Sequence, residues 1–196
     1  MITAGQVLVV CTGNVCRSPY IERRLRHELI GTGIQVSSAG THALVGQDMD
    51  PGTRDCLQHR GGDVDSFNAR ALTADLVRQA DLVITAAREH RAAAARLHPA
   101  AMGRTFTLRD LGDLLSNLSL DELAAAPDEP TSWVRQVAAT ASRRRGLVPA
   151  RQQGIDVTDP IGGQPSRFVL MAAEVDAALV PIVAALGLAA GPASDA

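Results

Sequence analysis

Four short runs of apolar and β-branched residues mark the first half of the chain, and each is followed by a loop or a helical pattern. Continuous apolar runs predict strands that are buried on both faces, as in a parallel sheet. Strands that alternate with helices favour right-handed βαβ units. The chain is therefore expected to form an α/β fold, with strands at residues 6–10, 34–38, 81–85 and 104–108.

Helical periodicity and capping residues predict the helices. Ser18 is placed to cap the first helix, with Pro19 at its first position. In the last helix the apolar positions recur every three or four residues, which indicates one buried face. The predicted helices cover 19–30, 50–59, 73–80, 89–97, 131–145 and 166–186, with short pieces at 111–115 and 120–126.

Length and composition narrow the class of protein. The 196 residues suit one domain over 1–196, with a longer connection at about 116–158 and a disordered tail after about 188. A net charge of −2 gives no electrostatic signal for nucleic acid. The longest apolar run, 177–190, is too short to span a bilayer, so we expect a soluble protein without membrane insertion. Three cysteines and no signal peptide favour a reducing cytoplasm.

The stretch with the clearest chemistry is Cys-Thr-Gly-Asn-Val-Cys-Arg-Ser-Pro, residues 11–19. It follows the first predicted strand and precedes the first predicted helix. Such a loop directs backbone N–H groups and a helix N-terminus at an anion. Arg17 can add a bidentate pair to two phosphoryl oxygens. These donors should also stabilise Cys11 as a thiolate, which is the nucleophilic form of cysteine.

Two simpler interpretations of this stretch are weaker. Cys11 and Cys16 could be small buried hydrophobic residues, but the full nine-residue pattern in its strand–loop–helix setting favours a phosphate site. A zinc site lacks a second ligand pair, because the five histidines are scattered without ligand spacing, so no metal is expected. Gly13 suits a tight turn and Asn14 tolerates a left-handed backbone.

The stretch resembles the signature of the low-molecular-weight protein tyrosine phosphatases. Further similarities are Ser-Ala-Gly-Thr at 38–41, Ala-Arg at 69–70, Ala-Asp-Leu-Val-Ile at 80–84, and Asp-Pro at 159–160 with Gly-Gly at 162–163. The resemblance implies a flavodoxin-like, three-layer fold with a four-stranded parallel sheet of order 2-1-3-4 and helices on both faces. It also implies a cytoplasmic phosphomonoesterase without cofactor that acts on phosphotyrosine proteins as a monomer or weak dimer.

The resemblance assigns roles to particular residues. Cys11 would be the nucleophile, Arg17 the phosphate clamp and Asp159 the general acid and base. Ser18 and Ser38 would hold Asn14 and so support the loop. The implied phosphate-binding residues are Thr12, Gly13, Asn14, Val15, Cys16, Arg17 and Ser18.

Three features depart from that family. Leu44 and Ile161 stand at rim positions where the family usually has aromatic residues that stack on a phosphotyrosine ring. Phe67 replaces a histidine of the loop-supporting network. The 116–158 connection is longer, and its Arg143–Arg145 run suggests a solvated helix end. Val15 is an apolar loop wall, as in the tyrosine-directed branch, whereas arginine phosphatases carry Thr there.

Two other functions remain open from the sequence. An arsenate reductase shares this loop, but its thiol relay needs further cysteines, and 85–98 contains none. A phosphate-binding regulatory module without catalysis would fit the altered rim. Cys11 and Cys16 could also form a reversible protective disulfide, as the family suggests.

Overall fold

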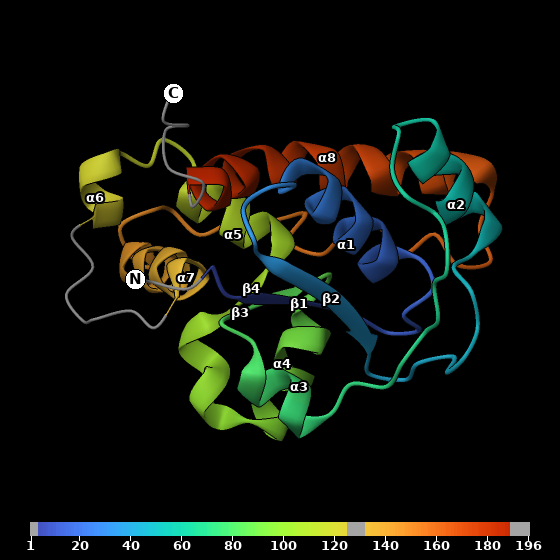
Figure 1. The fold of residues 1–196 in the computed structure, drawn as a ribbon, viewed down its shortest axis with the longest axis horizontal. Coiled ribbons are helices and arrows are strands. Elements are labelled where there is room, and N and C mark those ends of the chain that lie inside the picture. The colour runs from blue at the N-terminus through green and yellow to red at the C-terminus, as the bar shows by residue number, and fades with distance from the viewer. Residues whose placement is uncertain (1–3, 125–131, 189–196) are drawn as a thin grey trace.

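A computed structural model describes residues 4–124 and 132–188, and its centre is one sheet of four parallel strands. The strand order is β2-β1-β3-β4 (Figure 1), which confirms the order expected from the sequence. Every pairing is parallel. The strands are β1 (Gln6–Cys11), β2 (Gln35–Gly40), β3 (Leu82–Thr85) and β4 (Thr105–Thr107).

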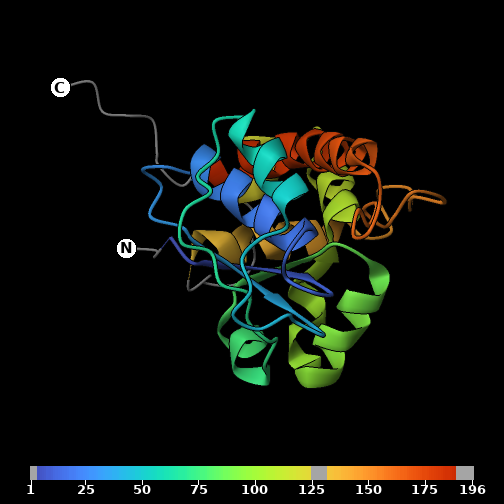
Figure 2. The ribbon, with the colours of Figure 1, turned by 90° about the vertical axis from the view of Figure 1, so that its right-hand side faces the viewer.

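Helices cover both faces of the sheet, so the three-layer prediction is also confirmed (Figures 1 and 2). Alternate residues of β1 enter different cores: Val7 and Val9 pack with the large cluster under α1 and α8, while Leu8 and Val10 pack towards α3 and α4. The helices are α1 (Arg17–Glu28), α2 (Pro51–Gln58), α3 (Ala74–Gln79), α4 (Arg88–Leu97), η1 (Pro99–Arg104), α5 (Leu108–Leu115), α6 (Leu120–Ala124), α7 (Trp133–Arg144) and α8 (Pro165–Gly187).

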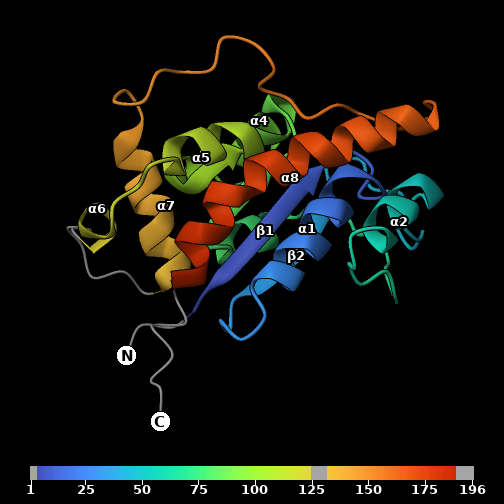
Figure 3. The same cartoon turned by 90° about the horizontal axis from the view of Figure 1, so that it is seen from above.

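Helix α8 crosses one face of the molecule from end to end (Figure 3). By length and composition alone this 23-residue helix could cross a membrane. Its buried residues step along one side and pack in the large core cluster, and α8 lies against α1, α2, α5 and α7. This one-sided burial is typical of an amphipathic helix that covers a sheet.

The start of α1 differs from the prediction. The helix begins at Arg17, with Cys16 as the capping residue, so Ser18 lies inside the first turn and does not cap it. The Ser18 hydroxyl contacts Cys11 and Asn14 instead. The 3₁₀ helix η1 was not predicted from the sequence. The helices predicted at 120–126 and 131–145 extend into 125–131, which lies outside the described residues, as does the tail after 188.

The arginines that end α7 also differ from the prediction of a solvated helix end. Of the three, only Arg143 is exposed. Arg144 pairs with Glu122 at 2.7 Å and donates to the Ser116 carbonyl. Arg145 stacks over the Phe106 ring, with its guanidinium carbon 4.0 Å from the ring centroid. The 116–158 connection is therefore fastened to the sheet by these side chains.

Candidate active site

The Cys11 loop, residues 11–17, joins the carboxyl end of β1 to the N-terminus of α1. Cys11 is the last residue of β1 and only 2% exposed, and Arg17 is the first residue of α1. In open parallel sheets this edge is where ligands bind. The N-terminus of α1 adds a positive partial charge there. The fold thus produces the anion site that the sequence pattern suggests.

Asn14 is the central support of the loop. Its backbone is left-handed, with φ of 56°, and its side chain is fully buried. Asn14 Nδ2 donates to Ser18 Oγ at 2.9 Å and to Ser38 Oγ at 2.8 Å. Its Oδ1 accepts from the backbone N–H of Arg70 at 2.9 Å. Three side-chain hydrogen bonds from three segments therefore hold a strained residue in place.

The sulfur of Cys11 receives two hydrogen-bonding groups. Ser18 Oγ lies 2.9 Å from Cys11 Sγ, and the Asn14 backbone N–H donates to the same sulfur at 3.3 Å. Because Ser18 Oγ already accepts from Asn14 Nδ2, its own proton is available to the sulfur. The sulfur at the base of the loop therefore has two potential hydrogen-bond donors beside it.

A second layer of contacts lies behind Ser38. The Ser38 hydroxyl donates to the carboxylate of Glu22, which is buried and paired with Arg26 at 2.8 Å. Phe67 is 8% exposed, and its ring faces Arg23 at 5.9 Å. The sequence left open how the network is completed without a histidine at Phe67. In the structure, the charged acceptor for Ser38 is Glu22 of α1.

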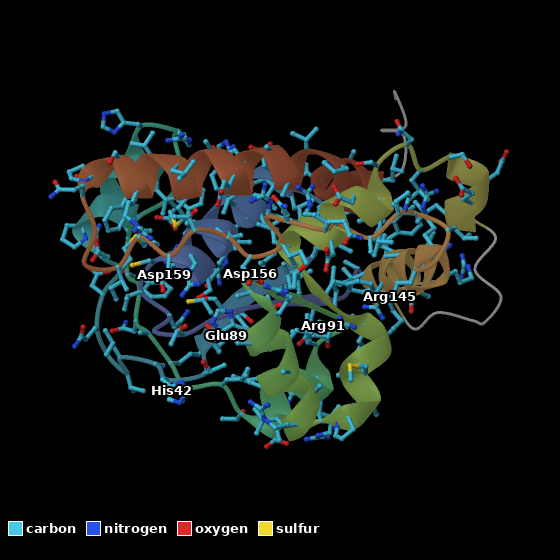
Figure 4. The ribbon with its side chains drawn as sticks, turned by 180° about the vertical axis from the view of Figure 1, so that it is seen from behind. His42, Glu89, Arg91, Arg145, Asp156 and Asp159 are labelled. Carbon is cyan, nitrogen blue, oxygen red and sulfur yellow. The ribbon has the colours of Figure 1, made fainter. Side chains whose placement is uncertain are left out.

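Arg17 and Asp159 meet at the mouth of the loop. Arg17 Nη2 lies 2.6 Å from Asp159 Oδ2 and 3.2 Å from Thr12 Oγ1. The side chain of Arg17 is 6% exposed and that of Asp159 is 42% exposed. A buried guanidinium thus faces a half-exposed carboxylate that follows it by 142 positions in sequence. Figure 4 labels Asp159, together with Asp156 of the same segment.

Asp159 is carried by residues 146–159, here called the Asp159 segment. Arg88 at the start of α4 holds Asp156 through its backbone N–H at 2.8 Å and its guanidinium at 3.1 Å. The N–H of Val157 donates to the Ala86 carbonyl at 2.8 Å, and that of Thr158 donates to Glu174 of α8 at 2.8 Å. The segment is therefore positioned from α4 and α8 and not by secondary structure of its own.

His90 is a functional candidate that sequence reasoning missed. It is 1% exposed on α4, and its Nε2 lies 2.9 Å from Thr12 Oγ1. Thr12 Oγ1 also accepts from Arg17 Nη2 at 3.2 Å, so the hydroxyl bridges His90 and Arg17. Burial and the nearby Arg17 lower the pKa of His90 to about 4. The neutral ring then orients the Thr12 hydroxyl towards Arg17. The contact spans 78 positions, so no local pattern reveals it.

The loop opens into a cavity of about 200 Å³. Its base is formed by loop residues, and its wall includes Leu44 and Ile161, which are 40% and 53% exposed. The structure therefore brings both expected rim residues to the mouth. His42 also lines the cavity and was not singled out from the sequence. Figure 4 labels His42 on the lower side of the molecule.

Two glycines shape this site in different ways. A Cβ on Gly40 would lie 2.4 Å from the Thr12 carbonyl oxygen, so the end of β2 can approach the loop only without a side chain. Gly13 was expected to permit a tight turn. Its φ is not positive, and an added Cβ would make ordinary contacts with Val15 and Leu44. Gly13 instead leaves the cavity free of a side chain.

The other two cysteines differ from Cys11 in their surroundings. Burial and the neighbouring Asp50 raise the pKa of Cys16 to about 12, so it is a thiol at neutral pH. Cys56 lies on α2 among core residues, and burial raises its pKa as well. Neither favours attack on an electrophile.

Comparison with known proteins places the chain among phosphatases. The family described as low molecular weight phosphotyrosine protein phosphatase matches residues 6–122, more than half of the chain. The low molecular weight protein-tyrosine-phosphatase Etp of Escherichia coli K12 is 40% identical over 101 residues, which are 52% of this chain and 67% of that protein. The family match ends before Asp159.

Solved structures share the fold. The tyrosine phosphatase Wzb from Escherichia coli K30, in complex with sulphate, is 31% identical and superimposes with a TM-score of 0.51 over 73% of this chain and 96% of that one. The YwlE arginine phosphatase from Geobacillus stearothermophilus is 21% identical, with a TM-score of 0.66 over 92% of this chain and 91% of that one. At that identity the second likeness concerns the fold alone.

Proposed function

This chain belongs to the low molecular weight phosphotyrosine protein phosphatase family, and from that membership and the site geometry we propose that it hydrolyses phosphotyrosine in proteins. One observation supports the proposal most strongly: Arg17 and Asp159 meet at 2.6 Å over the loop that holds Cys11. Nucleophile, clamp and acid are thereby collected around one cavity.

The first step is transfer of the phosphoryl group to sulfur. The phosphoryl oxygens replace Asp159 on Arg17 and accept N–H groups of the Cys11 loop, which neutralises their charge. The Cys11 thiolate attacks phosphorus and the bond to the ester oxygen breaks. Protonated Asp159 gives its proton to that leaving oxygen, so the products are a phosphocysteine and a free phenol.

The second step returns the enzyme to its starting state. Asp159, now a carboxylate, takes a proton from water as the water oxygen attacks phosphorus. The S–P bond breaks, the electron pair returns to Cys11 as thiolate, and inorganic phosphate leaves. Ser18 and the Asn14 backbone N–H stabilise the departing thiolate at 2.9 and 3.3 Å.

An aryl ester fits the mouth better than a charged alkyl ester. Val15, Leu44 and Ile161 give aliphatic walls that can contact both faces of a phenyl ring, with about 25 cal/mol gained per Å² of apolar surface buried. Aliphatic walls lack the offset stacking that an aromatic rim provides. The preference for tyrosine is accordingly supported by apolar contact with these walls.

The arsenate reductase alternative receives no support from the site. Its relay needs a second and a third thiol near the nucleophile. Cys56 sits on α2 within the core, and the start of α4 after β3 carries Arg88 and His90 instead. Three free cysteines agree with a reducing compartment, and we place the enzyme in the cytoplasm as a monomer or weak dimer acting on phosphoproteins.

One assay tests the proposed function. Wild type, Cys11→Ser and Cys56→Ser are incubated with a phosphotyrosine peptide, the matched phosphoserine and phosphoarginine peptides, and arsenate with a thioredoxin system. We expect phosphate release from phosphotyrosine by wild type and Cys56→Ser, and none by Cys11→Ser. A faster reaction on phosphoarginine would reject the substrate class. Thioredoxin-dependent arsenate reduction without phosphate release would reject the reaction.

A further inference from the structure

A second cavity, of about 240 Å³, lies beside α4, β4 and α5 and is closed by residues 145–151 and Ile155. It shares no lining residue with the cavity above Cys11. Its outer wall belongs to the part of the chain beyond residue 122, where the match to the family ends. This cavity is therefore separate from the phosphoryl site.

Two arginines on its wall share one backbone acceptor. Arg91 Nε and Arg145 Nη2 donate to the same acceptor, the Thr105 carbonyl, at 3.1 and 2.8 Å. Within residues 4–124 and 132–188, neither has a carboxylate oxygen within 4 Å, although Arg151 beside them pairs with Asp113 at 2.6 Å. Burial and the proximity of Arg91 lower the pKa of Arg145.

The hydrogen bonds that Arg91 and Arg145 donate to backbone carbonyls use only part of each guanidinium group. β4 is an edge strand, and the shared contact at Thr105 satisfies one of its unpaired carbonyls. Arg145 Nη1 makes a further contact of 3.4 Å with the Met102 carbonyl. In the described part of the chain, both terminal nitrogens of Arg91 have no acceptor. Figure 4 shows Arg91 and Arg145 approaching each other from α4 and from the end of α7.

The rest of the cavity combines aliphatic walls with three further charged side chains, Asp110, Asp113 and Arg151. Leu114, Val148 and Ile155 contribute the aliphatic walls, while Phe106 is only 1% exposed beneath Arg145. Asp110 also lines the cavity, so Arg91, Arg145 and Asp110 together leave one net positive charge once Arg151 and Asp113 are paired. A pocket with apolar walls and a few convergent polar groups is typical of small-ligand sites.

We propose that this cavity binds a small organic anion, with a carboxylate or phosphate group held by Arg91 and Arg145 and an apolar body packed against Leu114, Val148 and Ile155. Paired guanidiniums match the planar geometry of such oxyanions and add charge-assisted hydrogen bonds. The occupant would lie against residues 145–151, most of which belong to the first half of the Asp159 segment. It would also contact Arg91, the neighbour of His90.

Amide NMR of the full chain tests this binding site, because it reports which residues each probe touches. Benzoate carries the carboxylate and phenylphosphonate carries the phosphate-like group. We expect either probe or both to shift the amides of 105–106 and 145–151 saturably. Phenylphosphonate should in addition shift the amides of 12–17, which reports the phosphoryl site in the same titration.

Two variants and two matched controls locate the effect. Arg91→Gln and Arg145→Gln should weaken binding at 145–151 by about tenfold or more, which corresponds to about 1.4 kcal/mol. Arg96→Gln on α4 and Arg143→Gln on α7 replace exposed arginines outside the cavity and should leave it unchanged. If phenylphosphonate still shifts the amides of residues 12–17 in a variant, that variant is folded.

The response of the two probes identifies the anionic group. If only benzoate shifts the amides of 145–151, the cavity binds a carboxylate group. If only phenylphosphonate shifts them, the cavity binds a phosphate group. Shifts confined to 12–17 would overturn the proposal. Shifts at 145–151 that are equal in wild type, Arg91→Gln and Arg145→Gln would overturn it as well.

Discussion

The Cys11 loop and the Asp159 segment supply the two halves of one site, yet they are built in opposite ways. The loop is buried, and the Asn14 side chain holds it through hydrogen bonds to Ser18 of α1, Ser38 of β2 and the backbone N–H of Arg70. The Asp159 segment has no helix or strand, and the Asp159 side chain is 42% exposed. In the proposed mechanism the loop is therefore preorganised for charge, whereas Asp159 must release Arg17 when a phosphoryl group arrives.

Helix α4 connects the two regions. Arg88 at its start holds Asp156 of the segment, and His90 two residues later holds Thr12 of the loop. A rigid element that touches both parts sets the distance between acid and nucleophile. Because the loop is buried and the segment is more exposed, we expect mutations in the loop to cause large losses of activity and mutations in the segment to cause smaller ones.

Removal of the Asn14 side chain should have the largest effect. Asn14→Ala leaves the Arg70 backbone N–H, Ser18 and Ser38 without their common partner and a non-glycine residue in a left-handed conformation. We expect kcat/KM on an aryl phosphate to fall roughly 10²–10³-fold, comparable to loss of an oxyanion donor. Asn68→Ala, at an exposed position nearby, is the control. An Asn14→Ala enzyme with wild-type kinetics would show that the loop needs no such support.

His90 should make folding sensitive to acid. Its pKa is about 4 in the folded protein against an ordinary value of 6.5, so between these values the unfolded chain binds a proton that the folded chain does not. The free energy of unfolding should therefore fall as the pH drops from 6.5 to 4, by about 3 kcal/mol from this group.

The matched variant for this test is His90→Gln, which keeps an acceptor for Thr12 and removes the titration. Urea unfolding at a series of pH values should give a flatter dependence for His90→Gln than for wild type between pH 6.5 and 4. Parallel curves would contradict a buried neutral His90.

Loss of the Asp156 tether should have a smaller effect. Arg88→Gln removes the guanidinium contact to Asp156 but leaves the backbone N–H that also holds it. We expect kcat to fall about tenfold or less with KM nearly unchanged, because a slightly misplaced acid affects the transition state more than binding. Arg78→Gln, whose exposed arginine pairs with Asp75 in the same helix, is the control. An equal loss in both variants would reject positioning through Asp156.

The sequence predicted the fold well because its signals are local. The apolar pattern of each element lies within that element, and the helices expected at 50–59 and 73–80 form as α2 and α3. Ser18 was misjudged because a serine before a proline has the pattern of a helix cap, and only the folded loop shows its hydroxyl directed at Cys11.

From the residues alone, the site could be predicted only where it is contiguous in sequence, and Asp159 was expected only through the family resemblance. Cys11 and Arg17 are six residues apart and carry their own pattern, whereas contacts such as His90 with Thr12 and Arg88 with Asp156 join residues 78 and 68 positions apart. The pairing of Arg145 with Phe106 was missed for the same reason. Such contacts depend on how α4 and the 116–158 connection pack against the sheet.

The central claim is that Asp159, outside the matched part of the chain, is the acid for the Cys11 loop. It is tested most directly by the dependence of kcat/KM on leaving-group pKa over a series of aryl phosphates, in wild type and Asp159→Asn. A proton from Asp159 should make wild type nearly insensitive to the leaving group. Asp159→Asn should lose roughly 10²–10⁴-fold on the poorest leaving groups and much less on the best. Equal slopes for the two enzymes would contradict the account.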